Sequence, residues 1–264
     1  MFHKQKENKK NQEILLDIKN EIATITLNRP QHGNSLTISM VTKFLETFNK
    51  VTSDPIIRII VVTGTGKYFC TGLDLRDDNV NVEEGIRFFQ TVKECPKPVI
   101  AKINGPVFGG GIGFMFTMDI RIALSDTYFS FKEVKRGLVP AIISQYIIPE
   151  VGIFKTKQYM LTGEIISADQ ALSNNFLTCI AKDLKELDNK VNEYINELLS
   201  SAPGAMSTIK KLVKVVSSNN DDDTKINYIK QVFSDVMNSE EAAFGLKALR
   251  RKEQPNWSKF LSKL

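Results

Sequence analysis

Two glycine-containing segments are the strongest candidates for a reactive site in this sequence. One runs from Gly64 to Leu75, and the other runs from Asn104 to Gly113 and includes Gly109, Gly110 and Gly111 in succession. Consecutive glycines at the start of a helix expose backbone N–H groups, with the positive end of the helix dipole behind them. One donor from each segment would make a pocket for an oxyanion such as a thioester enolate. Each segment alone is more simply a tightly packed turn, so the chemistry depends on the pair.

Neither segment matches a familiar nucleotide-binding loop. Gly66 and Lys67 suggest a phosphate loop, but Val61 stands where that loop needs glycine and Tyr68 where it needs Ser or Thr. The glycines of the second segment have the wrong spacing for a dinucleotide fingerprint, and they come too late in the chain for an N-terminal Rossmann unit.

Histidine and cysteine usage limits the chemistry further. The two histidines are His3, in a basic tail, and His32, which makes a Ser-His-Asp or Cys-His arrangement and a His-ligated metal improbable. The three cysteines, Cys70, Cys95 and Cys179, form no CxxC pair, so neither a disulfide framework nor a zinc site is supported. We expect no metal, and an acid or base drawn from carboxylates, Lys, Tyr or Cys.

Hydrophobic periodicity predicts an α/β first half that positions these segments. The pattern indicates a hairpin, then strands and helices in alternation, with the glycine triplet opening a helix. The expected strands are 14–18, 23–27, 56–63, 99–103, 120–124 and 128–131, and the expected helices include 40–51 and 83–92.

Beyond Pro140 the apolar residues recur almost exclusively at helical spacing. Ser167 with Gln170 forms a capping box, and Pro203 suits the first turn of a helix. We therefore divide the chain into a basic tail, 1–12, a core, 13–200, and a C-terminal helical region, 201–264.

Composition indicates an ordinary globular protein. The 264 residues are 42% apolar and 25% charged, and the longest apolar run, 56–62, is interrupted by Arg58, so we expect no membrane-spanning segment. The net charge of +5 is concentrated at the two ends, 1–10 and 247–264. Residues 1–12 contain no aromatic residue except Phe2, which makes nucleic acid an unlikely partner. The cysteine usage and the lack of a secretory pattern favour an intracellular and cytoplasmic location, with mitochondrial and peroxisomal locations left open.

Four motifs in order resemble those of the crotonase (enoyl-CoA hydratase/isomerase) superfamily. They are Phe69-Cys-Thr-Gly-Leu-Asp-Leu75, Asn104-Gly-Pro-Val-Phe-Gly-Gly-Gly111, Asp119-Ile-Arg-Ile-Ala123 and Phe131-Lys-Glu-Val-Lys-Arg-Gly-Leu-Val-Pro140. The resemblance runs from residue 27 to residue 257. It implies a crotonase-like spiral of repeated ββα units, a C-terminal helical trimerisation region, and a homotrimer or a dimer of trimers.

The resemblance also implies the site. Its oxyanion donors would be the amides of Leu73 and Gly110, and its acid or base would be Glu133, four residues before Gly137. It implies no permanently bound cofactor, because coenzyme A enters as part of the thioester substrate. The implied substrate-binding residues are Thr71, Gly72, Leu73, Asp74, Leu75, Arg76, Gly109, Gly110 and Arg29.

Gly113 departs from the family pattern. Hydratases of the two-carboxylate type carry a second glutamate at this position, three residues after the donor glycine. A glycine here leaves room for a branched acyl group or allows close helix packing. The loop after the first motif holds Asp77 and Asp78, and Glu83 and Glu84 follow, as candidates for a replacement carboxylate.

Three activities fit this departure to different degrees. The Gly-Gly-Gly-Ile-Gly motif that ends at Gly113, followed by Glu133, resembles methylglutaconyl-CoA hydratase-like members. This favours addition of water to a 2-enoyl-CoA, including branched or carboxylated ones. The alternative is a Δ3,Δ2-enoyl-CoA isomerase with a single glutamate, whereas Gly113 and Ala141 count against a dienoyl-CoA isomerase. A further alternative is a non-catalytic relative that binds CoA or RNA.

Overall fold

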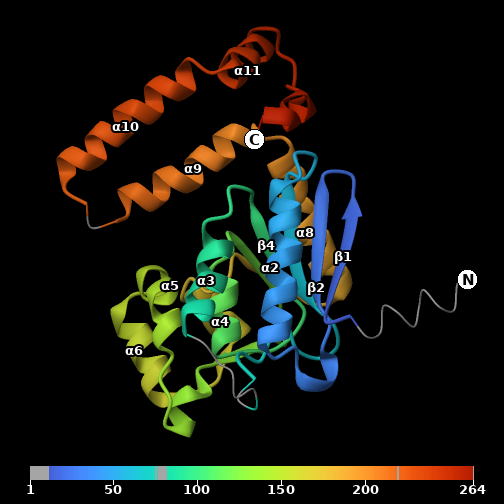
Figure 1. Cartoon of the computed structure of the whole chain (residues 1–264), viewed down its shortest axis with the longest axis vertical. Helices are drawn as coiled ribbons and strands as arrows, with labels where there is room; N and C mark the ends of the chain where they lie inside the picture. Colours follow the sequence, from blue (N-terminus) through green and yellow to red (C-terminus); the bar gives the residue numbers. More distant parts are fainter. Residues whose placement is uncertain (1–11, 75, 77–81, 219, 264) are drawn as a thin grey trace, which may run out of the picture.

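The computed structural model describes residues 12–74, 76, 82–218 and 220–263, and it is built around a six-stranded sheet (Figure 1). The strand order is β1-β2-β3-β4-β6-β9. The hairpin of β1 and β2 is antiparallel, and every later pair in this sheet is parallel. The strands are β1 (Ile14–Lys19), β2 (Ile22–Leu27), β3 (Ile59–Gly64), β4 (Val99–Ile103), β6 (Ile120–Leu124) and β9 (Cys179–Ala181).

A smaller sheet makes the repeated ββα pattern visible. Its strands are β5 (Val107–Phe108), β7 (Tyr128–Ser130) and β8 (Ile166–Ser167), in that order. Each of β4 and β6 in the large sheet is followed at once by a strand of the small sheet, and Cys70 adds an isolated bridge to Val107. The repeat therefore brings the turn after Cys70 next to the turn after β5, and the predicted fold class is confirmed.

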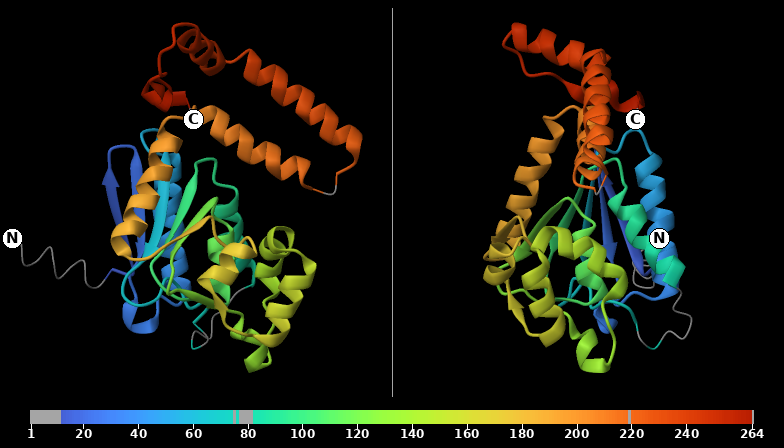
Figure 2. Two further views of the ribbon diagram at one scale, coloured as in Figure 1. Left: turned by 180° about the vertical axis from the view of Figure 1, so that it is seen from behind. Right: turned by 90° about the vertical axis from the view of Figure 1, so that its left-hand side faces the viewer.

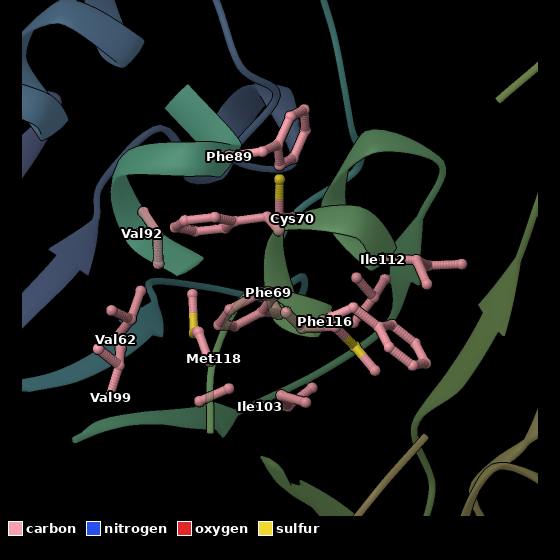
Figure 3. Packing of buried hydrophobic residues seen from close by; sticks show 14 of the residues in the cluster. Val62, Phe69, Cys70, Phe89, Val92, Val99, Ile103, Ile112, Phe116 and Met118 are labelled. Carbon is pink, nitrogen blue, oxygen red and sulfur yellow. The ribbon is translucent and has the colours of Figure 1, made fainter. Parts of the chain in front are cut away.

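Helices cover both faces of the large sheet, as Figure 2 shows. The helices α2 (Ile38–Ser53), α3 (Val82–Lys93) and α4 (Gly110–Phe116) enclose the larger apolar cluster on one face, and α8 (Leu184–Leu199) covers the other. Buried parallel strands need apolar residues on both faces, which explains the unbroken run in β3. Phe69, Cys70 and Phe89 point into the same cluster as Ile112 and Phe116 (Figure 3).

The second half of the core differs from the helical expectation. Besides α5 (Ala141–Val151), α6 (Ile153–Thr162) and α7 (Ala168–Ser173), it contributes β8 and β9. These strands have two and three residues, too few to show an alternating pattern, and β9 is held by pairing with β6. The expectation of helices alone beyond Pro140 is therefore wrong. The capping box at Ser167 is confirmed, since it begins α7.

The C-terminal region extends away from the sheet as a helical arm (Figure 1). It consists of α9 (Pro203–Val216), α10 (Asp222–Met237), α11 (Glu240–Arg250) and a final 3₁₀ segment, η3 (Trp257–Lys263). The Glu241 carboxylate of α11 accepts hydrogen bonds from the Gly204 and Ala205 amides at the start of α9. Among the helices in the described ranges, none is long and apolar enough to cross a membrane.

Candidate active site

The two glycine turns predicted from the sequence meet in the structure. Gly72 has a φ of +88°, and a Cβ atom placed on it would lie 2.9 Å from the Gly110 nitrogen and 2.9 Å from the Phe108 carbonyl oxygen. A Cβ on Gly110 would lie 3.5 Å from the Leu73 nitrogen. Glycine is required at Gly72 both by the backbone angle and by this close approach. The Leu73 and Gly110 amides are consequently neighbours.

Both of these amides are available to a ligand. Gly110 is the first residue of α4, where an amide has no intrahelical acceptor. On either side of Leu73, the Leu36 amide donates to Gly72 and the Asp74 amide donates to Leu36, so the backbone of this turn is fixed. Within the described residues, neither the Leu73 nor the Gly110 N–H donates to a backbone acceptor outside regular elements. The pair has the form of an oxyanion hole.

Glu133 brings a carboxylate to this pair. It lies in the 3₁₀ segment η2 (Lys132–Arg136), which directly follows β7 and Phe131 and is closed by Gly137 at a φ of +71°. Its Oε1 atom lies 2.6 Å from the Cβ position of Gly109, which has a φ of +49°. A side chain at Gly109 would therefore displace the carboxylate.

The Glu133 carboxylate is poorly stabilised in its charged form. Its Oε2 atom is buried and has no hydrogen-bond partner within the residues that the structure covers. Burial raises the pKa of Glu133 above its ordinary value of 4.5, and its own backbone amide and the nearby Arg136 charge oppose that rise only in part. A carboxyl group with a raised pKa beside two free amides is suited to exchange a proton with a bound thioester.

Other residues predicted to bind substrate form the frame of this turn. The Arg29 guanidinium donates to the Ser35 carbonyl at 2.6 Å and lies 3.4 Å from Asp74. Asp74 also accepts from the Ser35 hydroxyl and from Arg76, and the Arg76 hydrogen bond is the main reason that the pKa of Asp74 lies well below its usual range. The Thr71 amide donates to the Gly33 carbonyl.

The predicted substrate-binding set is therefore divided. Arg29 and Asp74 form a hydrogen bond that supports the first turn, whereas Gly72, Leu73, Gly109 and Gly110 lie where the two turns meet. Arg76 is exposed, with its guanidinium on Asp74 and near His32. Leu75 lies outside the described residues, as do Asp77 and Asp78.

The space beside Gly113 is filled. A Cβ atom at Gly113 would lie 2.5 Å from Cβ of Ile143 and closer still to its Cγ2, and 3.4 Å from Cε1 of Phe89. Ile143 lies in the first turn of α5 and is 4% exposed. The structure thus favours the close-packing interpretation of Gly113 over room for a branched acyl group. Sequence reasoning missed Ile143, because no local pattern links residue 143 to residue 113.

The remaining candidate charged residues within the described ranges lie on α3 and η2. Glu83 and Glu84 lie in the first turn of α3, and Glu83 is exposed to solvent. Lys135 and Arg136 of η2 are also exposed. A search of the described residues finds no group of three His, Cys, Asp or Glu side chains that could hold a metal ion.

Comparison with known proteins agrees with this geometry. A curated enoyl-CoA hydratase of Alternaria alternata is 34% identical over 86% of this chain and 77% of its own length. An (E)-benzylidenesuccinyl-CoA hydratase of Thauera aromatica is 31% identical over 75% of this chain and 80% of its own. The solved structure of an enoyl-CoA hydratase from Shewanella pealeana has a TM-score of 0.87 and 27% identity, and the match covers 93% of this chain and 96% of that one.

The family model described as enoyl-CoA hydratase/isomerase matches residues 17–260, which include both glycine turns and Glu133. The chain therefore belongs to the enoyl-CoA hydratase/isomerase family.

Proposed function

We propose that this protein adds water across the double bond of a 2-enoyl-CoA thioester with Glu133 as its single catalytic carboxylate. The observation that carries the proposal is the position of the Glu133 carboxylate against Gly109, next to the free Leu73 and Gly110 amides. The hydratase names of the relatives support hydration over isomerisation.

The two amides act on the thioester oxygen. Hydrogen bonds from Leu73 and Gly110 stabilise the negative charge that develops there as the enolate forms, and the helix dipole of α4 adds to that stabilisation. Each such donor typically contributes a factor of about 10²–10³ to the rate.

Glu133 moves the proton. Its carboxylate accepts a proton from water while the water oxygen forms a bond to C3, and the resulting carboxyl group delivers a proton to C2 of the enolate. Water is consumed, and the carboxylate is regenerated. The raised pKa of Glu133 serves both steps, because it brings the acid and base forms closer in free energy near neutral pH.

Branched or carboxylated acyl groups are the proposed substrates. The support is the 31% identity to a hydratase named for a succinyl thioester that carries a benzylidene group. Lys135 and Arg136 are the nearest exposed cations on the Glu133 segment that could meet a distal carboxylate.

The test uses linear, branched and carboxylated enoyl-CoAs in deuterated water, with products read by mass spectrometry. Wild-type protein should add one water per thioester, and Glu133→Gln should lose about 10²–10⁴-fold in rate and lose deuterium exchange at C2. Glu46→Gln, a change on the exposed side of α2, is the matched control and should keep full activity. Full activity in the Glu133→Gln protein would overturn the proposal.

A second candidate is Δ3,Δ2-isomerisation, and a specific observation favours it. Ile143 fills the place where a second carboxylate would project, and one carboxylate can shuttle a proton between C2 and C4. Deuterium incorporation without a gain of water would assign this activity instead. Binding of CoA thioesters without any product would point to a non-catalytic relative.

We also propose that the helical arm assembles the protein into a homotrimer or a dimer of trimers. The support is that α10 buries no residue within one chain, while Ile226, Ile229, Phe233 and Met237 are exposed. Light scattering should give a mass of three or six chains, and Phe233→Ser should lower it, whereas Lys230→Ser should not. A monomeric wild-type protein would refute this assembly.

A further inference from the structure

Two glycines, one in α3 and one in α4, allow the first turn of α5 to pack closely against both helices. Ile142 approaches Gly85 of α3, where a Cβ would lie 3.1 Å from Ile142 Cδ1. The next residue, Ile143, approaches Gly113 of α4 even more closely. The consecutive isoleucines therefore fit into two gaps that glycine leaves on two different helices.

Ile143 cannot leave its gap at low cost. The atoms that crowd Gly113 are Cβ and Cγ2 of Ile143, which lie at the stem of the side chain and not at a flexible end. A β-branched residue in a helix has one strongly preferred χ1 rotamer, so only a shift of α5 would clear the space. Phe89 closes the same region from α3 and is also buried.

Ile143 and Phe89 form an apolar wall beside Gly113, on the same face of α4 as Gly110. Residues three apart in a helix share a face, and the rise from Gly110 to Gly113 is about 4.5 Å. The face at Gly110 is the one that meets Leu73, since the Cβ position there is 3.7 Å from Cγ of Leu73. If the Leu73 and Gly110 amides hold the carbonyl oxygen of an acyl group, the C3 atom of that group and its substituents lie about as far along α4 as Gly113 and Ile143.

We propose that Ile143 determines acyl specificity by limiting the bulk that a substrate can carry at C3. The inference rests on the proposed binding of an acyl-CoA at the Leu73 and Gly110 amides. Shortening Ile143 removes the wall and opens a space next to Gly113, which wild-type protein lacks. The space beside Gly113 can therefore hold a larger acyl group only when residue 143 is changed.

The experiment measures binding and not turnover. The dissociation constants of butanoyl-CoA and 3,3-dimethylbutanoyl-CoA, which have no double bond to hydrate, are compared by calorimetry. Ile143→Ala should shift the ratio of dissociation constants about tenfold in favour of the bulkier thioester. This factor corresponds to the burial of roughly two methylene groups. Ile143→Val keeps Cβ and Cγ2, the two atoms that crowd Gly113, and should leave the ratio within about twofold of wild type.

Ile147→Ala is the matched control, because Ile147 is fully buried one turn further along α5. It should lower the melting temperature to a similar degree and leave the ratio of dissociation constants within about twofold of wild type. An unchanged ratio in Ile143→Ala, or an equal shift in Ile147→Ala, would overturn the inference.

The two proposals fail separately. Turnover of enoyl-CoA with an unchanged binding ratio in Ile143→Ala would remove the specificity role and leave the hydratase intact. A shifted ratio in a protein that produces no hydrated or isomerised thioester would remove the proposed function and leave Ile143 as the residue that limits the acyl group. If Ile143→Ala does not fold, wild-type protein decides: it should bind 3,3-dimethylbutanoyl-CoA more weakly than butanoyl-CoA, and equal dissociation constants would overturn the inference.

Discussion

Two carboxylates stand at the glycine turns, and their surroundings are opposite. Asp74 accepts hydrogen bonds from Arg76 and Ser35 and lies 3.4 Å from Arg29, and its pKa falls well below the usual range. Glu133 has a buried Oε2 atom without a partner in the described part of the chain, and burial raises its pKa.

The difference separates a structural carboxylate from a reactive one. A carboxylate that already accepts several charged or polar hydrogen bonds is held in its ionised form and is a poor proton carrier. A desolvated carboxylate with a free oxygen retains the capacity to bind and release a proton. The contrast fits the proposed division of roles, in which Asp74 supports the first glycine turn and Glu133 carries the proton.

The largest predicted effect follows from crowding Glu133. Gly109→Ala places a Cβ 2.6 Å from Oε1 of Glu133 and should displace that carboxylate, with a loss of about 10²-fold in kcat. Gly109 has a φ of +49° and a ψ of −121°, outside the left-handed helical region, so the added strain should cost about 1–3 kcal/mol of stability. Steady-state kinetics and thermal unfolding measure the two effects.

Gly152→Ala is the control for strain alone, because Gly152 has a φ of +85° and a ψ of 157°, also outside the left-handed helical region, and nothing lies within 4 Å of its Cβ position. It should lose similar stability and keep kcat within a few-fold. Equal kcat losses in the two variants would mean that strain, and not displacement of Glu133, explains the effect.

A smaller effect is expected from removing the structural carboxylate. Asp74→Ala leaves the Arg29 guanidinium and the Ser35 hydroxyl without this acceptor, and we expect a loss of about 1–3 kcal/mol in the free energy of unfolding. Urea denaturation measures the loss. Arg76→Ala, which removes only the exposed partner of Asp74, should cost less. If the two variants are equally stable, the buried partners of Asp74 are not what holds the turn.

The smallest effect is a pair of opposite pH dependences. The lowered pKa of Asp74 stabilises the fold above its unfolded value of 3.8. The deficit of Asp74→Asn relative to wild type should therefore be constant well above pH 3.8 and begin to shrink as the pH falls below that value, disappearing only below the much lower folded pKa. The raised pKa of Glu133 has the reverse sign. As the pH rises above 4.5, the unfolded chain ionises first, and wild type should lose stability relative to Glu133→Gln.

Melting temperatures measured from about pH 3 to about pH 8 would test both signs on the same set of proteins. Parallel curves for wild type and Glu133→Gln would show that burial does not perturb this carboxyl group. That result would contradict the raised pKa of Glu133 and leave the lowered pKa of Asp74 unaffected.

The sequence predicts the first half of the fold well, because its elements carry strong local signals. The hairpin, β4 and the helix after Gly109 follow from alternation, β-branched runs and glycine placement. The strand expected from residue 56 begins at Ile59, because Pro55 and Ile56 form a turn and residues 57–58 lead from that turn into the strand. The short strands β8 and β9 escape prediction, since pairing with distant strands and not their own pattern defines them.

The site is predicted in its backbone and less well in its side chains. The motifs place Gly72, Gly110 and Glu133 together as expected, because each lies just after a strand of the repeated unit. The inward direction of Arg29 and the filling of the gap at Gly113 depend on partners far away in the chain. Such contacts leave no periodic signal in a single sequence.

The fit of Ile143 to Gly113 also constrains the order in which substitutions can accumulate. Any side chain introduced first at residue 113 meets the stem of Ile143 and would have to move α5. A shorter side chain at residue 143 removes Cγ2 and creates a cavity, which a fold of ordinary stability can tolerate, but its Cβ still lies 2.5 Å from the Cβ position of residue 113, so α5 must also shift before residue 113 can change. A mutational path from this site to one with two carboxylates, or back, therefore passes through α5 before it reaches α4.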